Sequence, residues 1–413
     1  MKAEIITIGD ELSSGSVQNT NATFIAAQLH TIGIEVVKIT TVGDYTETIV
    51  DALRSAQQKV SFVIVTGGLG PTMDDITTRA AAEALRRKLV LNKRALKAME
   101  EKFQKYGRTM SPHNVKQAYL PSDSTLIPNP IGTACGFSLA KSSTLFIFLP
   151  GVPREMKRMF QESVTPVIKK EQPETSLVRS RVLKIFGKTE SYCDQMLSDV
   201  IKREKEITFS FLPHYPEISL KFTMRGNDKK YIEKKLKAVE RTITKILGDI
   251  IFGKDEETLE EVVGNLLRSK GATISLAESC TGGLITHRLT NVPGSSDYLE
   301  RSLIVYSNKA KKELLKVPAP ILNRFGAVSK ETAECMAKGV KSLSKTNFGL
   351  AVTGIAGPTG GTTEKPVGTV FISLAHSRYI TTQKYRFYGD REQIKFMTSH
   401  YALDTLRKHL IEN

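Results

Sequence analysis

Cysteine is scarce in this chain, and it has no long apolar run of the kind that crosses a membrane. The four cysteines are widely spaced, which matches neither a zinc site nor a disulfide framework. The longest uncharged stretch, residues 346–363, is rich in Gly, Thr and Pro and too polar to span a bilayer. Glu4 and Asp10 interrupt the early apolar run, so no signal pattern is present. We therefore expect a reduced, cytoplasmic protein with no membrane partner.

A dedicated nucleic-acid arm is also missing, although the net charge is +16. The lysines of residues 229–245 alternate with acidic residues, which is typical of a solvated helix face. We find no contiguous basic stripe and no aromatic stacking platform. Nucleic acid is therefore not the expected partner, and anionic small-molecule nucleotides suit the basic surface better. A DNA-associated binding protein without catalysis is the alternative hypothesis.

The rhythm of apolar segments predicts three domains in the 413 residues. Residues 1–170 alternate strand and helix patterns, which predicts a doubly wound α/β domain. Residues 171–253 follow the order βαββαβ, which predicts a small ferredoxin-like α+β connecting domain. From 255 to 413 the α/β rhythm returns. In this last domain we expect a helix and a strand at 258–267 and 272–276, strands at 303–306 and 348–352, and a final helix at 394–410.

A glycine-rich cassette at residues 66–77 follows the third strand of the first domain. Gly67, Gly68 and Gly70 allow close approach of a phosphate, and a helix N-terminus follows. The adjacent carboxylates of Asp74 and Asp75 would repel an anion unless a cation bridged them, which suggests Mg²⁺ or a similar divalent metal shared with a pyrophosphate. No Walker A lysine follows, so the cassette is not a P-loop. In the structural alternative, Thr72 or Asp75 only caps the helix.

A second turn, residues 277–283, links an apolar strand to an amphipathic helix. Ser279 would lie among free backbone N–H groups at a helix N-terminus, where an oxyanion is stabilised. The alternative is that Ser279 or Thr281 caps the helix. Further along, Lys311 is one of three lysines at the start of a helix that Ser307 or Asn308 would cap. The helix dipole and partial burial would lower the pKa of such an amine and make it a general base, unless it is a solvated surface lysine.

Two further segments add binding groups to this predicted site. Residues 353–358 form another glycine-rich turn after a strand, and Arg391 precedes the final helix, with Asp390 as its expected cap. An arginine there can hold a phosphate with two hydrogen bonds. A turn serine, an activated lysine, a glycine loop and an arginine together indicate acyl or amide hydrolysis on a phosphorylated substrate.

The cassette at 66–77 resembles the TGGxGPTxDDxT signature of the MoaB/MogA-like molybdopterin-binding fold, and residues 8–12, 20–21, 129–134 and 149–156 resemble the competence/damage-inducible CinA family. The resemblance implies a metal-dependent ADP-ribose pyrophosphatase, with pterin binding or adenylyl transfer as alternatives. It implies the following site residues: Asp44, Asp74 and Asp75 for the metal or the attacking water, Gly67, Gly68, Gly70, Thr72 and Asn129 for the substrate, and Glu11 as a further candidate. Residues 15–18 differ from the commonest family pattern, so no role is carried over to Gln18.

Residues 278–283, 306–308, 354–358 and 389–391 resemble the CinA C-terminal family, the nicotinamide mononucleotide (NMN) deamidases. The resemblance implies a homodimer whose C-terminal site uses no cofactor. It implies Ser279 as nucleophile, Lys311 as base and Tyr306 as a proton-transfer aid. Its implied substrate-binding residues are Thr281, Gly282, Gly283, Thr353, Gly354, Gly357 and Arg391. Cys280 is a rival nucleophile that we discount, because no histidine is near it in sequence.

Overall fold

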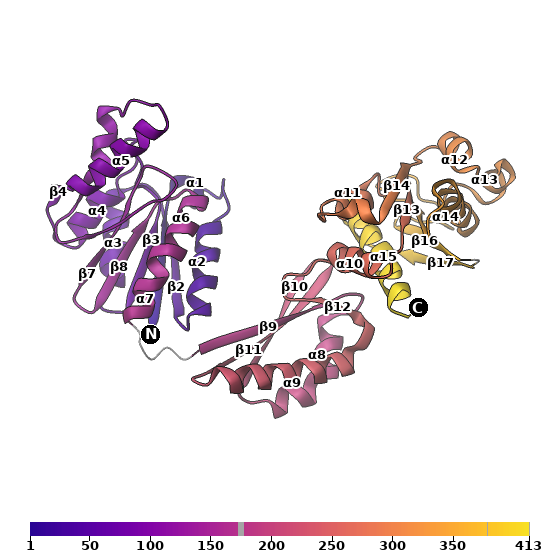
Figure 1. Ribbon diagram of the computed structural model, residues 1–413, viewed down its shortest axis with the longest axis horizontal. Helices are drawn as coiled ribbons and strands as arrows, with labels where there is room; N and C mark the ends of the chain where they lie inside the picture. The colour runs from indigo at the N-terminus through magenta and orange to yellow at the C-terminus, as the bar shows by residue number, and fades with distance from the viewer. Residues whose placement is uncertain (172–176, 378, 413) are drawn as a thin grey trace. The chain divides into compact units, whose positions relative to one another are not determined.

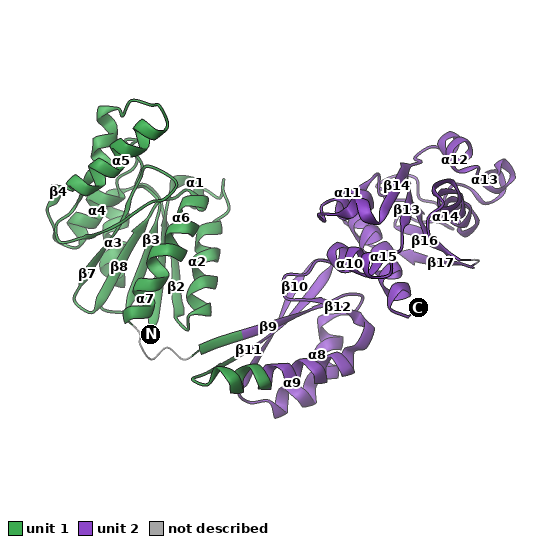
Figure 2. Ribbon diagram, viewed as in Figure 1, with its two compact units in different colours: residues 1–179, 224–234 green, residues 180–223, 235–413 purple. Residues whose placement is uncertain are grey.

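The computed structural model describes residues 1–171, 177–377 and 379–412 and divides the chain into two compact units (Figures 1 and 2). One unit comprises residues 1–179 and 224–234, and the other comprises 180–223 and 235–413. Residues 172–176, near the start of the predicted connecting domain, lie outside the described residues. The three predicted domains divide the chain more finely, and their boundaries stay a prediction.

The N-terminal domain contains a six-stranded sheet in the order β2-β1-β3-β8-β7-β6. The first four of these strands are parallel, and β7 and β6 run antiparallel at one edge. From β1 the chain passes to β2 on one side and then to β3 on the other, so the sheet has a switch point between β1 and β3. The strands are β1 (Lys2–Ile8), β2 (Glu35–Val42), β3 (Phe62–Thr66), β6 (Thr125–Ile127), β7 (Gly136–Lys141) and β8 (Thr144–Leu149).

Helices cover both faces of this sheet because successive strand residues point to opposite sides. Ile5 and Ile64 pack in the core under α2 and α6, whereas Ile6 and Val65 pack in the core under α3 and α4. The predicted doubly wound α/β fold is therefore confirmed. The remaining elements are α1 (Asp10–Ser13), α2 (Thr20–Thr31), α3 (Thr46–Ala56), α4 (Thr77–Ala84), β4 (Leu89–Leu91), α5 (Lys93–Lys105), η1 (Pro112–Ala118), β5 (Tyr119–Pro121), α6 (Pro153–Met159), η2 (Phe160–Val164) and α7 (Thr165–Glu171).

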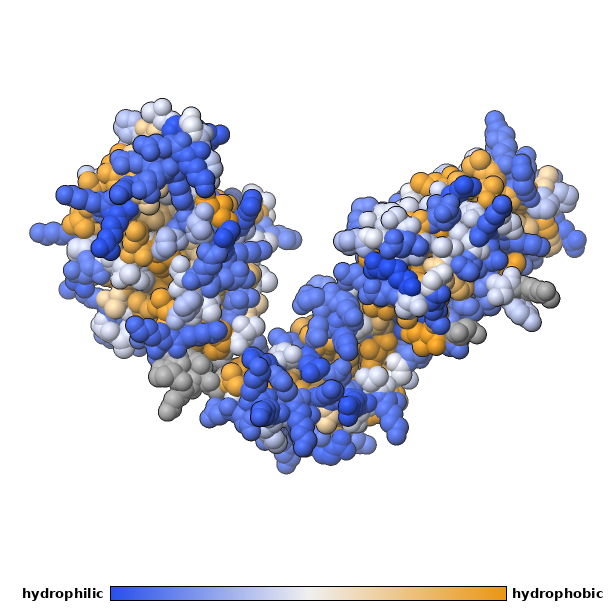
Figure 3. Space-filling model, in the orientation of Figure 1, coloured by the Kyte–Doolittle hydropathy of each residue, from blue (hydrophilic) through white to orange (hydrophobic). Residues whose placement is uncertain are grey.

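The connecting segment forms a four-stranded sheet in the order β10-β11-β9-β12, which is the ferredoxin-like arrangement that its element order predicts. Ile232, Leu236, Val239 and Ile243 recur at helical spacing on α9 and are buried. The solvent face of α8 and α9 is hydrophilic (Figure 3). The elements are β9 (Leu177–Ile185), α8 (Glu190–Arg203), β10 (Ile207–His214), β11 (Glu217–Gly226), α9 (Lys229–Leu247), η3 (Gly248–Ile250) and β12 (Ile251–Lys254).

The C-terminal domain contains a five-stranded sheet in the order β14-β13-β15-β16-β17, in which the first three strands are parallel. Apolar residues of α10, α11 and α15 share one core, and those of α14 and the α12–α13 region share another. The elements are α10 (Leu259–Ser269), β13 (Ile274–Glu278), α11 (Leu284–Thr290), η4 (Ser295–Asp297), β14 (Leu299–Ile304), α12 (Asn308–Leu315), α13 (Ala319–Phe325), α14 (Lys330–Ser344), β15 (Phe348–Gly354), β16 (Thr369–His376), β17 (Tyr379–Arg386) and α15 (Arg391–Glu412).

The ends of two strands in this sheet differ from the prediction. We expected strands at 272–276 and 303–306, but β13 and β14 pair in parallel from Ile274 with Leu299 to Glu278 with Ile304. The charged residues Glu300 and Arg301 are exposed on this edge strand, so its first half does not read as an apolar run. The shift places Glu278 inside β13 and leaves Tyr306 beyond the end of β14.

The parts of the connecting segment that belong to the second unit pack against the C-terminal domain. Phe186 and Phe252 belong to the same core as α10 and α15. Arg407 of α15 is 2% exposed and donates hydrogen bonds to the carbonyl oxygens of Asp249, at 2.5 Å, and Ile251, at 3.4 Å. Among the described residues, no helix combines the length and the apolar character needed to span a bilayer.

Candidate active sites

A serine–lysine pair lies at the carboxyl end of β13. The Lys311 Nζ donates to the Ser279 Oγ at 3.1 Å and to the carbonyl oxygen of Val305 at 2.7 Å. Lys311 is 1% exposed, so the alternative of a solvated surface lysine is wrong. Burial lowers the pKa of Lys311 to about 8. The predicted direction of the shift is confirmed, and burial is its main cause.

Glu278 organises the turn that presents Ser279, and sequence reasoning gave it no role. Its buried carboxylate accepts hydrogen bonds from the hydroxyls of Thr281 and Thr286, both at 2.6 Å. It also accepts from the backbone N–H groups of Gly283, Ile285 and Thr286, at 3.0, 3.2 and 2.8 Å. The alternative that Ser279 or Thr281 caps α11 is therefore wrong, because Glu278 accepts hydrogen bonds from the N–H groups at the start of this helix. The nucleophile candidate is left free of a capping role.

The glycine-rich turn at residues 353–358 and the segment that carries Arg391 meet beside Tyr306. The Arg391 guanidinium donates to the Tyr306 hydroxyl at 2.8 Å and to the Gly357 carbonyl oxygen at 2.6 Å. The Asp390 carboxylate accepts from the N–H of Gln393 at 2.8 Å, so its predicted capping role is confirmed. Tyr306 is 60% exposed, which leaves this side of the site open to a ligand.

Two predicted substrate-binding threonines are buried behind the turn. Thr281 is fully buried, and its hydroxyl donates to Glu278. Thr353 is 1% exposed, and its hydroxyl donates to the Ala327 carbonyl oxygen at 2.8 Å. Next to it, a Cβ on Gly354 would lie 2.7 Å from Val370, so that glycine permits close packing against β16. In this arrangement both threonine hydroxyls hold the scaffold of the site.

Cys280 is buried and 5% exposed, next to the nucleophile candidate. Burial raises the pKa of its thiol to about 12, so the thiol stays protonated at neutral pH. A protonated thiol is a poor nucleophile, which supports the decision to discount it.

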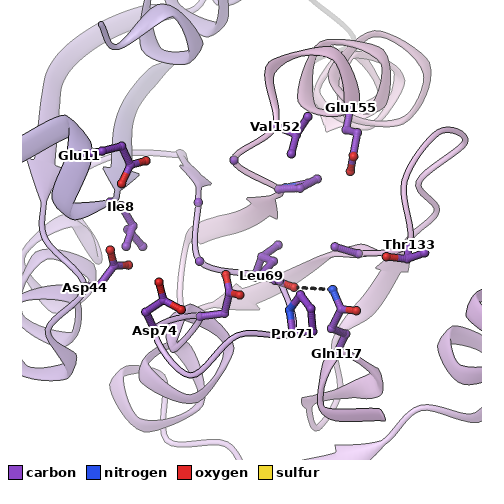
Figure 4. Close-up of a pocket in the computed structure, with 18 residues that line it drawn as sticks. Ile8, Glu11, Asp44, Leu69, Pro71, Asp74, Gln117, Thr133, Val152 and Glu155 are labelled. Carbon is purple, nitrogen blue, oxygen red and sulfur yellow. Dashed lines mark hydrogen bonds between the residues drawn. The ribbon is translucent and has the colours of Figure 1, made fainter. Parts of the chain in front are cut away.

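The N-terminal candidate site is a cavity of about 400 Å³ at the switch point of the sheet (Figure 4). The segments that follow β1, β3 and β8 line it, which is where doubly wound sheets bind ligands. Gly67 has φ +114°, and a Cβ there would lie 2.1 Å from the Ile8 carbonyl oxygen. Gly68 has φ +63°, and a Cβ there would lie 2.2 Å from the Thr77 hydroxyl. Both positions therefore require glycine.

Acidic side chains face this cavity from several segments. In Figure 4, Glu11, Asp44 and Asp74 project toward it from one side and Glu155 from across it. The Asp44 carboxylate accepts from the N–H of Asp10 at 2.9 Å. Burial raises the pKa of Asp44, and the negative charges of Asp10, Glu11 and Asp74 add to the rise, against the lowering effect of that hydrogen bond. The cavity therefore concentrates negative charge.

Asp75 lines the cavity but is already engaged within its own loop. Its carboxylate accepts from the N–H of Thr72 at 2.8 Å and from the Thr72 hydroxyl at 2.5 Å. Neither residue caps α4, because Ile76 holds the N-cap position without a side-chain hydrogen bond. The capping alternative is therefore wrong, and the pair fixes the cassette loop.

The carboxylates fit a divalent cation that takes its other ligands from a phosphate. Among the described residues, no group of three or more His, Cys, Asp or Glu side chains is already gathered as a metal site. The charges of Glu11 and Asp74 nevertheless add to the raised pKa of Asp44, and a hard cation with oxygen ligands would favour its ionised form. Such an ion would be held by Asp44 and Asp74, with Asp75 steadying the loop, and would neutralise the charge of a bound pyrophosphate.

Asn129, a predicted substrate-binding residue, holds the neighbouring loop. Its amide donates to the Ala134 carbonyl oxygen at 2.8 Å and to the Glu155 carboxylate at 2.7 Å, and its oxygen accepts from the N–H groups of Ile131 and Gly132, both at 2.9 Å. It is 5% exposed and does not line the cavity. Gln117 and Glu155 do, and neither was predicted, although Glu155 lies in a segment that carried the family resemblance.

Three protein-family profiles match consecutive parts of the chain. They are described as "Probable molybdopterin binding domain" over residues 4–170, "Damage-inducible protein CinA KH domain" over 180–253 and "CinA C-terminal domain" over 256–410. A "CinA-like protein" of Geotalea uraniireducens is 44% identical over 411 residues, covering 100% of this chain and 98% of the relative. The chain belongs to the CinA family. Another CinA-like protein, from Geobacter metallireducens, is 43% identical over 413 residues, with 100% of both chains covered.

Part of the chain is also similar to a protein of solved structure. A crystal structure of the competence/damage inducible protein CihA from Agrobacterium tumefaciens is 41% identical and covers 37% of this chain and 93% of its own, with a TM-score of 0.36. The family profiles and the full-length CinA-like relatives confirm the resemblance to the CinA family and to the MoaB/MogA-like fold. The CinA connecting domain, which we predicted as ferredoxin-like, corresponds to the segment that the profile names a KH domain.

Proposed function

We propose that the C-terminal site is a serine amidohydrolase that converts NMN to nicotinate mononucleotide and ammonia. The supporting observation is the 3.1 Å contact between the Lys311 Nζ and the Ser279 Oγ in a buried setting. A lysine with a pKa of about 8 is partly neutral near physiological pH and can accept a proton from a serine hydroxyl.

The proposed reaction has two steps. Neutral Lys311 removes the proton from the Ser279 Oγ as that oxygen attacks the carboxamide carbon, and the Lys311 ammonium then protonates the departing nitrogen, which leaves as ammonia. In the second step Lys311 removes a proton from water, which attacks the acyl-enzyme ester. The bond to the Ser279 Oγ breaks, the Lys311 ammonium returns the proton to that oxygen, and nicotinate mononucleotide leaves as the carboxylate. The N–H groups of Gly282 and Gly283 are already bonded within the turn, so we assign the oxyanion to those of Cys280 and Thr281.

Substrate binding in this proposal uses the exposed side of the site. Arg391 would hold the phosphate of the mononucleotide with the Gly357 loop beside it. The Tyr306 hydroxyl accepts from Arg391, which leaves its own proton available for the proton-transfer role that we predict. Gly282 and Gly283 have φ +64° and +98°, left-handed conformations that favour glycine in the turn next to the nucleophile.

The test measures ammonia release from NMN by the wild type and by Ser279→Ala, without added metal. We expect robust release that falls at least about 10³-fold in the variant, because the nucleophile is lost. Ser269→Ala, on α10, is the matched control and should retain activity. No ammonia from the wild type, or undiminished release by Ser279→Ala, would contradict the proposal.

We propose as a second activity that the N-terminal site is a metal-dependent ADP-ribose pyrophosphatase. The supporting observation is the set of carboxylates at Glu11, Asp44 and Asp74 around a cavity bordered by the Gly67–Gly70 loop. A cation there would bridge these carboxylates to the pyrophosphate, and the loop glycines would let the phosphates approach the backbone.

This second proposal is tested by AMP release from ADP-ribose with Mg²⁺. Asp74→Asn should reduce the rate about 10²-fold or more, whereas Asp75→Asn should mainly loosen the loop and cost less. Glu100→Gln, on α5 and outside the cavity lining, is the control. Tight ADP-ribose binding without AMP release would favour a pterin-type or other nucleotide-binding role instead.

We also propose a cytoplasmic homodimer, for which light scattering should give twice the mass of one chain.

A further inference from the structure

A second cavity of the C-terminal domain, here called the distal cavity, lies at the opposite end of the sheet from Ser279. It has a volume of about 350 Å³ and is lined by Ala272 and Phe348, which lie just before β13 and at the start of β15. These strands are parallel, and Ser279 follows the other end of β13. The distal cavity is therefore separate from the proposed deamidase site, because the two lie at opposite ends of the same strands.

Basic side chains gather at the distal cavity. Lys270, Lys341 and His409 line it, and the ring of His376 lies 3.9 Å from that of His409, centroid to centroid. Among the described residues, no Asp or Glu lines the distal cavity, and no salt bridge engages Lys270 or Lys341. The charge of Glu412 acts on His409. The described lining of the distal cavity is thus mainly basic and neutral.

The histidine pair reports the positive potential of this pocket. Burial lowers the pKa of His376, and His409 and Lys341 lower it further. Burial also lowers the pKa of His409, with Glu412 acting against this shift and Lys270 adding to it. An anion bound between these groups would favour the charged imidazoles and raise both pKa values.

The remaining walls give the pocket a fixed shape and a mixed character. The Phe348 ring packs edge-on against the His409 ring, with centroids 5.5 Å apart, whereas the His376 ring is tilted against it. The His409 ring therefore contacts two other rings. The Asn347 side-chain oxygen accepts from the N–H of Thr273 at 2.8 Å, which leaves its amide N–H₂ as a donor. Ala272, Phe348 and Leu410 supply apolar surface. Donors and cations beside an apolar wall suit an ester of phosphate better than a bare ion.

We propose that the distal cavity binds a phosphate monoester through Lys270, Lys341 and His409, at a site distinct from both proposed catalytic centres. The cations and the imidazole would contact the phosphate oxygens, and the Phe348 side would contact the organic group. Two lysines and an imidazole can serve the three terminal oxygens of a monoester together.

The test is a titration of the full chain, with its histidine rings labelled with ¹³C, at constant ionic strength. The probes are inorganic phosphate, phenyl phosphate and acetate. The chain has seven histidines, of which His376 and His409 report the distal cavity, while His287 lies on α11, the helix that follows the Ser279 turn, and serves as the comparison. We expect phenyl phosphate to shift His376 and His409 saturably and to raise their pKa values, with inorganic phosphate binding several-fold more weakly.

Matched variants separate a built site from general surface charge. Lys270→Gln combined with Lys341→Gln should weaken phenyl phosphate binding at least about tenfold, while Lys338→Gln, a single charge removed from the exposed face of α14, should leave it within about twofold. Absence of a saturable shift, equal shifts in the double variant, or acetate binding as tightly as phenyl phosphate would each overturn the proposal. Phenyl phosphate binding no tighter than inorganic phosphate would overturn the monoester assignment.

Discussion

The two candidate active sites differ in how far the folded chain assembles them by itself. At the C-terminal site, the Lys311 amine already contacts the Ser279 hydroxyl, and protein burial alone brings the amine's pKa to about 8. At the N-terminal site, burial and the nearby charges of Asp10, Glu11 and Asp74 raise the pKa of Asp44, and no cationic side chain of the described residues pairs with it there. Proton transfer can be set up by protein groups alone, whereas binding a pyrophosphate among carboxylates requires a cation from solution.

Metal removal gives the largest expected contrast between the sites. EDTA should reduce AMP release from ADP-ribose to background, because the Asp44 and Asp74 carboxylates would then repel the pyrophosphate. Ammonia release from NMN, measured on the same treated sample, should stay within about twofold of its starting rate. Restoring Mg²⁺ should recover AMP release, which controls for damage by the chelator. AMP release that persists in EDTA, or ammonia release that is lost together with it, would contradict the claim that only the N-terminal site requires a metal ion.

Replacing Lys311 with Met tests the C-terminal site next. The flexible apolar side chain fills much of the same buried space but cannot accept a proton, so we expect ammonia release to fall about 10³- to 10⁴-fold. The N-terminal AMP release should not change. Lys309→Met, on the exposed first turn of α12, is the control and should behave as wild type. A Lys311→Met variant with more than a tenth of the wild-type rate would remove Lys311 as the base.

Glu278→Gln tests whether the shape of the Ser279 turn depends on the buried carboxylate of Glu278. The amide N–H₂ would face some of the five donors that Glu278 now satisfies, so we expect ammonia release to fall about 10²-fold and the free energy of unfolding of the C-terminal domain to fall by about 3 kcal/mol. Chemical denaturation and the NMN assay measure the two effects. Glu261→Gln, in the capping box of α10, is the matched control for stability without loss of activity. An unchanged rate would show that the turn holds its shape without Glu278.

The sequence reveals the sheets more readily than the sites, because alternation and helical spacing are local signals. Ile5 and Ile6 pack on opposite faces of β1, as neighbouring apolar residues in a doubly wound sheet must. The edge strand β14 is harder to predict, because the exposed charged residues Glu300 and Arg301 interrupt the apolar pattern in its first half. Strand ends depend on the pairing register, which a single segment does not encode.

Side-chain roles in the sites depend on tertiary contacts that spacing alone does not reveal. Lys311 could be placed on the correct helix, but only the packing of α12 makes it 1% exposed. Glu278 and Asn129 bind donors that become neighbours only when a turn closes. Asp75 was expected among the metal ligands, yet its hydrogen bonds to Thr72 show that it also fixes the loop. Residue types at the sites were predictable, and the division between chemistry and support was not.

The smallest expected difference between the two sites is in the pH dependence of their rates. We expect the rate of ammonia release to change about tenfold per pH unit below the pKa of Lys311. The neutral form of Lys311 is the active base, so kcat/KM for ammonia release should rise with pH below about 8 and level off above it. Because the pKa of Lys311 is lower in the folded state than in the unfolded chain, the unfolded chain binds more protons between that pKa and the ordinary value of 10.5. Stability should therefore rise with pH over this window. Rates measured from pH 6.5 to 9.5 test the first point, with AMP release as the internal comparison. A flat profile for ammonia release below pH 8 would mean that no group of this pKa limits the reaction, and the serine–lysine mechanism would fail.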